Sequence, residues 1–276
     1  MEMTVLLVHR AHRFSPNCVE RDAALLRTIG EALEAKGFRV EHVEETQLTA
    51  EVLQRAPSRI VSMARSKVAV TLLRDWDMQE GHKVWNAPQA VLHNTRARQT
   101  LRFIEANIPL PPSEVTNRPC ETSLNFPLWV KMGGGDAEAE ADVRYFASRE
   151  ELLCADFSDV TPYVVSEHVE GDLVKFYGIA GTPFFYVYYP TLGKSGFSKF
   201  GLEAHNGVPQ EYAYDVEALY RLTTKAASVS GFTLYGGDCI VRPDGTFALI
   251  DFNDFPSFAP CVTEAARAFT ALFLQS

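Results

Sequence analysis

The sequence lacks the features that mark disulfide-rich, zinc-binding and basic nucleic-acid-binding proteins. Its five cysteines are an odd number and none stands in a CxxC pair, which argues against a disulfide framework and against a structural zinc site. The formal net charge is −9 at pH 7, whereas sequence-independent binding to nucleic acid needs a basic face. We therefore expect reduced thiols, a cytoplasmic protein and no nucleic-acid partner.

Long apolar runs, repeats and the common nucleotide-binding motifs are also missing. The first apolar run, 5–8, is too short for a signal peptide, and no later run is long enough to span a bilayer, so we expect no membrane partner. No GxxxxGK[ST] loop occurs and no GxGxxG follows the first predicted strand, which leaves a P-loop and a Rossmann cofactor site without support. A small-molecule or peptide substrate is expected, and composition leaves a monomer and a homodimer both open.

The residues that are present predict an α/β protein. The run TVLLV at 4–8 predicts a buried parallel strand, apolar residues at helical spacing over 25–33 predict a helix that ends at Gly37, and FRVEHV at 38–43 alternates like a second strand. This βαβ opening predicts a parallel sheet. Further strands are expected at 59–61 and 67–73, and one continuous helix at 89–107.

The proline-rich segment IPLPP at 108–112 marks the expected domain boundary, because each proline fixes its own φ and favours extended geometry before it. We predict an N-terminal α/β domain over 1–108 and a second domain over 109–276. In the second domain, strands are expected at 127–132, 142–147 and 162–169, a hairpin at 173–179 and 183–189, and a final hairpin at 234–241 and 246–252 with a turn at Pro243-Asp244-Gly245.

The final hairpin carries a group of oxygen ligands. Asp238 lies on its first strand, and Asp251 and Asn253 lie two residues apart on the second, so these two project from the same face. Such a set suits Mg²⁺, which takes one or two carboxylates and completes its shell with substrate phosphates and water. Apolar neighbours favour a buried metal site over the alternative of a solvated hairpin face, since buried charges need a metal or a partner.

A lysine followed by glycines marks a second site. Lys131 lies inside the apolar strand at 127–132, and Gly133, Gly134 and Gly135 follow it. A strand lysine before a glycine loop can present its ammonium to a phosphate while backbone N–H groups line the same space. The pattern predicts a phosphate site, with an ordinary edge-strand lysine as the alternative.

A third segment, SEHVEGDLVK at 166–175, is a strand that ends in an acidic turn. Its strand end can offer backbone groups to an adenine edge, and the nearby carboxylates of Glu170 and Asp172 can accept hydrogen bonds from a ribose. Acidic turns after strands are common, so this segment is informative only together with the others.

Taken together, the residues over about 86–260 resemble an ATP-grasp enzyme of the carboxylate–amine ligase type. Four segments occur in the family's order: ANIPLPP, the link from the N-terminal domain; PLWVKMGGG, the phosphate-binding strand and glycine loop; VVSEHVEGDLVKFYGIAG, the adenine hinge; and GGDCIVRPDGTFALIDFNDFPSF, the metal hairpin. The resemblance implies an α/β ATP-grasp fold preceded by a parallel βαβ domain, with a small ATP lobe at about 113–169 and a C-terminal lobe at about 170–276.

The resemblance also implies roles for single residues. Asp238, Asp251 and Asn253 would hold Mg²⁺, as two ions that Mn²⁺ can replace. His168 occupies a hinge position that we interpret as structural. The nucleotide-binding set would comprise Lys131, Gly134, Gly135, Glu167 and Val169 through backbone groups, Glu170 or Asp172 toward the ribose, Lys175, and a basic helix residue, Arg96 or Arg98.

The chain departs from the family's pattern in three places. Gly236 and Gly237 precede the first metal-binding acid, and Ser257 follows Pro256 where a glycine is usual. No clear arginine is present to stabilise the transferred phosphoryl group. The substitutes available are Lys194 and Lys199, or His205 with Asn206, with Lys175 as a further catalytic candidate.

Three functions follow from these residues. The leading hypothesis is an ATP- and Mg²⁺-dependent ligase that activates a carboxylate as an acylphosphate for attack by an amine or thiol, releasing ADP and phosphate. The alternative is a kinase on the same fold that phosphorylates a small hydroxyl acceptor such as an inositol phosphate, for which the acidic chain offers few clustered cations. A non-catalytic nucleotide-binding domain is the third, and the intact set of metal and phosphate residues argues against it.

Overall fold

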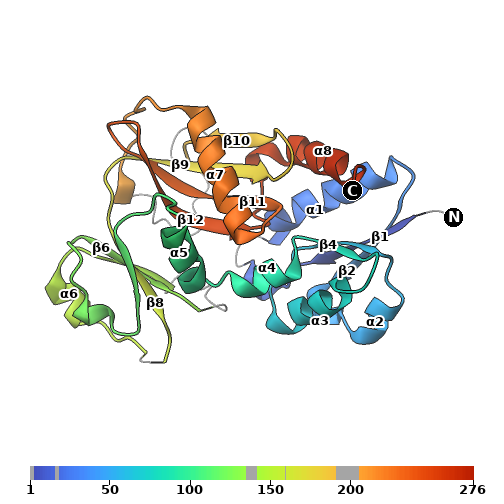
Figure 1. The fold of residues 1–276 in the computed structure, drawn as a ribbon, viewed down its shortest axis with the longest axis horizontal. Coiled ribbons are helices and arrows are strands. Elements are labelled where there is room, and N and C mark those ends of the chain that lie inside the picture. Colours follow the sequence, from blue (N-terminus) through green and yellow to red (C-terminus); the bar gives the residue numbers. More distant parts are fainter. Residues whose placement is uncertain (1–2, 16–18, 135–141, 159, 191–204) are drawn as a thin grey trace.

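The computed structural model of the chain describes residues 3–15, 19–134, 142–158, 160–190 and 205–276. These residues form three four-stranded sheets, one parallel and two antiparallel, with helices packed around them (Figure 1). The predicted mixed α/β class is therefore confirmed. Among the described residues, every helix is too short or too polar to cross a bilayer.

The N-terminal sheet is parallel, as predicted, with the order β2 (Arg39–Glu44), β1 (Thr4–His9), β3 (Arg59–Ser62), β4 (Lys83–Trp85). Alternate residues of β1 reach different cores. Val5 and Leu7 pack with α1 (Val19–Glu34) and α8 (Val262–Phe273), whereas Leu6 and Val8 pack with α2 (Ala50–Gln54) and α3 (Lys67–Asp77). Both faces of the sheet are thus buried, as a parallel sheet requires.

Two predicted elements of the N-terminal region are wrong. Residues 67–73 form helix α3 rather than a strand, because Ser66 caps the Ala69 N–H and the buried residues recur at helical spacing. The continuous helix expected at 89–107 is two helices, α4 (Pro88–His93) and α5 (Arg96–Glu105). The break lies at Asn94, whose side-chain amide donates to the carbonyls of Ala90 and Ser230.

The small antiparallel sheet has the order β5 (Ser113–Thr116), β8 (Tyr163–Glu167), β6 (Leu128–Met132), β7 (Val143–Phe146). Along each strand, successive side chains point to opposite faces of this sheet. Leu128, Val130 and Val165 enter a core with α6 (Arg149–Leu153), which directs the intervening Trp129 and Lys131 to the opposite face. That opposite face lines the cavity described below.

The C-terminal antiparallel sheet has the order β10 (Phe185–Tyr188), β9 (Asp172–Ile179), β11 (Leu234–Val241), β12 (Phe247–Asp254), which confirms both predicted hairpins. Helix α7 (Val216–Ser230) begins at a cap made by Asp215 and covers one face. The remaining short helices are of the 3₁₀ type: η1 (His12–Phe14), η2 (Glu45–Gln47), η3 (Pro119–Glu121) and η6 (Ala259–Cys261).

Distant parts of the chain are joined by packing. The last helix, α8, returns to pack on α1 near the N-terminus, with Phe269 and Phe273 in one core with Leu25 and Ile29 (Figure 1). The buried side chain of Asn86 accepts from the N–H groups of Thr233 and Leu234 and donates to the Leu234 carbonyl. These contacts fix the start of β11, the strand that carries Asp238.

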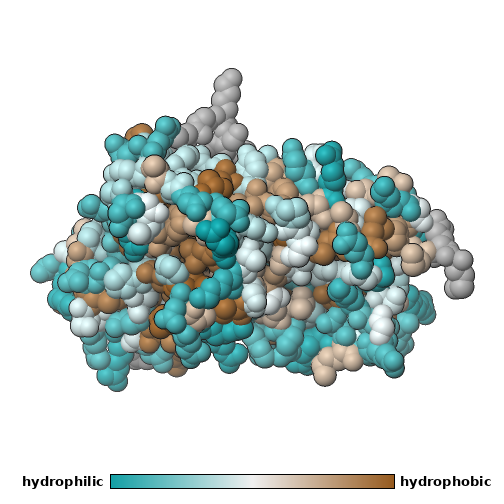
Figure 2. Space-filling view, turned by 45° about the horizontal axis from the view of Figure 1, so that its top comes forward, coloured by the Kyte–Doolittle hydropathy of each residue, from teal (hydrophilic) through white to brown (hydrophobic). Residues whose placement is uncertain are grey.

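The face of the molecule in Figure 2 is largely hydrophilic, with apolar residues in scattered groups rather than in one continuous area. The large apolar side chains that are exposed are spread over several elements, with Leu101 and Ile104 together on α5. They include Val68, Met78, Leu101, Leu153 and Val208.

Candidate functional site

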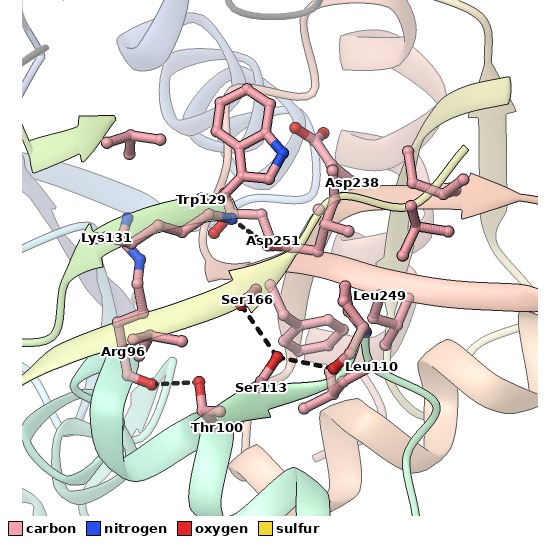
Figure 3. A pocket seen from close by; sticks show the side chains of 18 of the residues that line it. Arg96, Thr100, Leu110, Ser113, Trp129, Lys131, Ser166, Asp238, Leu249 and Asp251 are labelled. Atoms are coloured by element: carbon pink, nitrogen blue, oxygen red, sulfur yellow. Dashed lines mark hydrogen bonds between the residues drawn. The ribbon is translucent and has the colours of Figure 1, made fainter. Parts of the chain in front are cut away.

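A cavity of about 350 Å³ lies between the two antiparallel sheets, and α5 closes one end. One wall is the face of the small sheet that carries Trp129, Lys131 and Ser166 (Figure 3). The other wall is the β9–β11–β12 face that carries Asp238, Asp251 and Asn253. The structure therefore brings the phosphate-binding and metal-binding candidates, predicted from segments more than a hundred residues apart, into one cavity.

The carboxylates of the C-terminal wall lie side by side across neighbouring strands. Asp238 on β11 is opposite Asp251 on β12 and opposite Lys175 on β9. The Lys175 ammonium lies 3.0 Å from both carboxylate oxygens of Asp238, and the two side chains are only 17% and 22% exposed. The amide of Asn253 donates to Asp251 at 2.6 Å. One row across the sheet therefore carries an ammonium followed by two carboxylates, in the order Lys175, Asp238, Asp251.

A β-bulge shapes this wall. Asp238 pairs with Asp251 but Cys239 pairs with Leu249, so Ile250 is an extra residue on β12. The Ile250 carbonyl accepts a hydrogen bond at 2.5 Å from the ammonium of Lys131, which reaches across from the opposite wall. Bulges commonly redirect backbone and side-chain groups beside functional sites. Here the bulge supplies the acceptor through which Lys131 contacts the carboxylate strand.

The two glycines before Asp238 are required by close packing at this bulge. A Cβ on Gly237 would lie 2.1 Å from the Asp251 carbonyl oxygen, and a Cβ on Gly236 would lie 2.7 Å from the Phe176 carbonyl oxygen. Real Cβ atoms do not approach a backbone oxygen so closely, so only glycine fits. This departure from the family's pattern is thus a consequence of how tightly β9, β11 and β12 approach beside Asp238.

Asp251 and Lys131, on opposite walls of the cavity, affect each other's pKa. Burial alone would raise the pKa of Asp251, but the charges of Lys131 and Arg96 and the Asn253 hydrogen bond outweigh it, and the pKa lies below its usual range. Burial lowers the pKa of Lys131, while Asp251 opposes that shift. Asp251 therefore ionises more easily than an ordinary aspartic acid, and Lys131 loses its proton more easily than an ordinary lysine.

The donor set fits a hard divalent cation. Asp238, Asp251 and Asn253 present carboxylate and amide oxygens, which are the ligands that Mg²⁺ prefers. Among the described residues there is no group of three or more His, Cys, Asp or Glu side chains suited to holding a metal without outside ligands. Substrate phosphates and water would therefore have to complete the shell. A metal would also compete with Lys175 for Asp238.

Two prolines change the backbone hydrogen bonding at the end of the hinge strand. The Glu167 N–H donates to the Pro112 carbonyl and the His168 N–H donates to the Pro127 carbonyl. In an antiparallel ladder each partner would return a hydrogen bond, but proline has no N–H. The carbonyls of Glu167 and His168 thus lack their ladder donors. Glu167, His168 and Val169 all line the cavity, in keeping with a backbone role at the hinge.

The structure places three of the predicted side chains outside the cavity lining. Asp172 is buried away from the cavity, and its carboxylate accepts from the N–H groups of Gln210 and Tyr212 at 2.6 and 2.8 Å, so we replace its predicted ribose contact with a structural role. Glu170 is exposed and does not line the cavity. Arg98 is exposed on α5, whereas Arg96 lines the cavity and donates to the Met132 carbonyl at 2.7 Å.

The remaining predicted residues are placed as follows. Gly134 follows the cavity strand β6, and nothing lies within 4 Å of the position a Cβ would take on it. Asn206 lines the cavity, while the His205 ring stacks on Tyr145 with centroids 4.3 Å apart. Gly135, Lys194 and Lys199 lie outside the described residues.

Sequence reasoning missed two features of the cavity. Trp129 faces it from β6, and this was detectable, because a residue two positions before Lys131 on a strand shares its face. The second is the hydrogen-bonded pair of Ser113 and Ser166, 3.0 Å apart on β5 and β8 (Figure 3). Their pairing depends on strand register, for which the sequence carries no signal.

Comparisons with known proteins give a match in structure but not in sequence. No protein-family model matches the chain, and no curated protein matches it. Among solved structures it is similar to a D-alanyl-alanine synthetase A from Vibrio cholerae, with a TM-score of 0.68, 14% identity, and coverage of 99% of this chain and 97% of that one.

Two further structures are similar over nearly the whole chain. A D-alanine–D-alanine ligase from Bacillus anthracis complexed with ATP gives a TM-score of 0.66 at 12% identity, covering 99% of this chain and 95% of that one. The ATP-grasp ligase PsnB complexed with a minimal precursor gives 0.63 at 16% identity and covers both chains completely. At these identities the likeness establishes the fold and leaves the reaction to be argued from the site.

Proposed function

We propose that this chain, which has the ATP-grasp fold, is an ATP- and Mg²⁺-dependent ligase that joins the carboxylate of a small molecule or peptide to an amine. The observation that carries the proposal is the convergence of Lys131 with Asp238 and Asp251 in one cavity. The cationic and carboxylate groups on facing walls suit a triphosphate that binds together with a metal. The names of the similar structures, two ligases and a synthetase, favour ligation as the reaction.

The proposed reaction has two displacement steps. An oxygen of the substrate carboxylate attacks the γ-phosphorus of ATP, the bond from that phosphorus to the β–γ bridging oxygen breaks, and ADP leaves with the electron pair. The nitrogen of a neutral amine then attacks the acyl carbon of the acylphosphate, the carbon–oxygen bond to phosphate breaks, and the nitrogen loses a proton to solvent. A thiol would follow the same second step. One ATP is consumed, and one ADP and one phosphate are released.

The residues of the cavity serve this reaction chiefly by positioning and by electrostatics. Lys131 and Arg96 would contact phosphate oxygens from the small-sheet side. Lys175, which pairs with Asp238 on the other wall, would offset charge on the transferred phosphoryl group. A backbone carbonyl at the end of β8, that of Glu167 or that of His168, would accept from the base.

Asp238, Asp251 and Asn253 would hold Mg²⁺. The bound metal supplies positive charge to the phosphate oxygens, which lowers the repulsion that an anionic carboxylate meets as it approaches them. The low pKa of Asp251 keeps this ligand ionised and ready for a metal at neutral pH.

A product balance tests the proposal. The protein is incubated with ATP, Mg²⁺ and pools of amino acids, short peptides and other carboxylic acids, and ADP, AMP and free phosphate are measured together. A ligase releases ADP and phosphate in equal amounts, and only when both a carboxylate and an amine are supplied. ADP without matching phosphate would mean that the phosphoryl group stays on an acceptor, and a kinase would replace the ligase.

A further inference from the structure

Trp129 lies on the face of β6 that lines the cavity, and neighbouring side chains contact it there. Its indole Nε1–H donates to Nδ1 of His168 at 3.1 Å. Its ring also meets the edge of Tyr145, on β7, with centroids 5.1 Å apart. Figure 3 shows the indole standing in the same cavity as Lys131, Asp238 and Asp251. A half-buried tryptophan fixed by a hydrogen bond and a ring contact presents a defined aromatic surface.

The opposite wall provides an apolar surface for a flat ligand. Leu173 on β9, Ile240 on β11 and Ala248 on β12 form a small buried cluster, and Val169 and Ile250 pack against it. Except for Ala248, these residues line the cavity. Part of the cavity therefore has an aromatic ring on one wall and branched aliphatic side chains on the other, beside the charged part.

We propose that Trp129 is the stacking platform for the purine base of the nucleotide, and that His168 is a positioning residue that sets the plane of the Trp129 ring. This inference rests on the proposed function, because the base is that of ATP. Trp129 and Lys131 are two residues apart on one strand face, about 7 Å along the strand. An aromatic ring followed by an ammonium matches the order of base and phosphates in a nucleotide.

The Trp129–His168 hydrogen bond also fixes the chemical state of His168. An indole N–H can only donate, so Nδ1 of His168 must accept and its proton must lie on Nε2. Burial lowers the pKa of His168; Glu170, on the same loop, opposes this shift and His205 adds to it. Tyr145, on β7, faces the His168 ring edge-on. Protonation would place an N–H against the indole N–H, so the ring would lose its anchor in acid.

Titration calorimetry with three ligands tests the platform. ATP, CTP and inorganic tripolyphosphate are titrated in Mg²⁺ into the wild type, Trp129→Ala and Trp129→Phe. Base stacking on an aromatic side chain predicts that Trp129→Ala weakens ATP binding roughly 5- to 150-fold and weakens CTP less. Tripolyphosphate, which has no base, should bind all three proteins within about twofold of one another. Trp129→Phe, which keeps an aromatic face, should lose less affinity for ATP than Trp129→Ala.

The outcomes separate this inference from the function on which it rests. Unchanged ATP affinity in Trp129→Ala, or equal losses for ATP and tripolyphosphate in both variants, would overturn the platform. A wild-type protein that binds neither ATP nor tripolyphosphate would refute the proposed function itself, and the inference with it.

A pH series tests the positioning role. His168 is replaced by asparagine. The side-chain oxygen of asparagine can accept a hydrogen bond from the indole N–H, and the amide does not titrate. For the wild type, ATP affinity relative to tripolyphosphate should fall as pH is lowered through the depressed His168 pKa. His168→Asn should show no such fall, and neither should Trp129→Phe, which has no N–H to repel. The same pH response in all three proteins would overturn the role of His168.

Discussion

The two sheets that wall the cavity have the same number of strands and the same antiparallel pairing, yet they carry different chemistry. The small sheet offers Trp129, Ser166 and a single ammonium, Lys131, while the C-terminal sheet offers two carboxylates and Lys175. Each sheet uses its other face for a separate core. In the proposed function, Lys131 contacts the phosphates from one wall and the carboxylates of the other wall hold the metal, so neither wall alone would bind a metal–triphosphate.

The two lysines differ in the same way. Lys175 is paired within its own sheet, with Asp238 on the adjacent strand, whereas Lys131 crosses the cavity to the Ile250 carbonyl. The Lys131 contact therefore links the two sheets. A phosphate that took this ammonium would replace a neutral backbone acceptor by an anionic one, which makes a shorter and stronger hydrogen bond.

The largest effect is expected from breaking the carboxylate wall. Asp251→Asn keeps the size of the side chain but removes the charge that faces Lys131 and the metal, so turnover should fall about 10³-fold. Turnover at saturating Mg²⁺ and the melting temperature are measured together. Asp244→Asn, an exposed acid in the turn of the same hairpin, is the matched control and should keep turnover within about twofold of wild type. Full activity in Asp251→Asn would remove this residue from the metal site.

The next effect is expected from the cation of the small sheet. Lys131→Met keeps an apolar stem but loses the ammonium, so affinity for ATP should fall roughly 10- to 150-fold, the range for a hydrogen bond to a charged group. Calorimetry measures the affinity, and Lys225→Met, which changes an exposed lysine on α7, is the control. Equal affinities in the two variants would make Lys131 a structural residue.

The same lysine predicts a pH dependence in the alkaline direction. The protonated form binds phosphate, and burial lowers the pKa of Lys131 below the ordinary lysine value. ATP affinity should therefore be complete below this pKa and should decline as pH rises through it, at a lower pH than an ordinary lysine would cause. Lys131→Met should show no such decline. An identical alkaline decline in the variant would assign it to another group.

A smaller effect separates the two arginines of α5. Arg96→Ala should weaken ATP binding about tenfold, since it removes a cation that lines the cavity. Arg98→Ala, two residues along and exposed, should change it by no more than about twofold. The two variants differ only in which face of one helix they change. A larger loss of ATP affinity in Arg98→Ala than in Arg96→Ala would instead support Arg98 as the residue that contacts the nucleotide.

The smallest effect on nucleotide binding is expected at Asp172. Its carboxylate accepts from two backbone N–H groups, so Asp172→Asn should lower the free energy of unfolding by about 1–3 kcal/mol while ATP affinity stays within about twofold. Denaturant unfolding and calorimetry on the same sample measure both quantities. A large loss of ATP affinity without loss of stability would support the original prediction that Asp172 contacts the ribose.

The site elements that could be predicted from the sequence are those set by local chemistry. The turn at Pro243-Asp244-Gly245 fixes where β11 and β12 meet, and strand alternation then places Asp251 and Asn253 on one face. The role of Lys131 was predicted in the same way, from a charged residue inside an apolar strand. In each case a few neighbouring residues carry the whole signal.

Long-range packing explains what the sequence did not predict. The run at 67–73 is rich in β-branched residues, but a cap at Ser66 and burial against β1 make it a helix. Asp172 is paired with residues 38 and 40 positions away, and the bulge at Ile250 follows from the register with β11. Such pairings leave no local pattern, so an acid after a turn resembles a ribose ligand until its partners are known.

In the proposed function, the two walls of the cavity bind a nucleotide and a metal together. The most direct test of this is the Mg²⁺ dependence of ATP affinity, measured by calorimetry in the wild type and in Asp251→Asn. We expect Mg²⁺ to strengthen ATP binding strongly in the wild type and Asp251→Asn to lose most of this gain. An equal gain in the two proteins, or wild-type affinity that does not depend on Mg²⁺, would refute joint binding of nucleotide and metal.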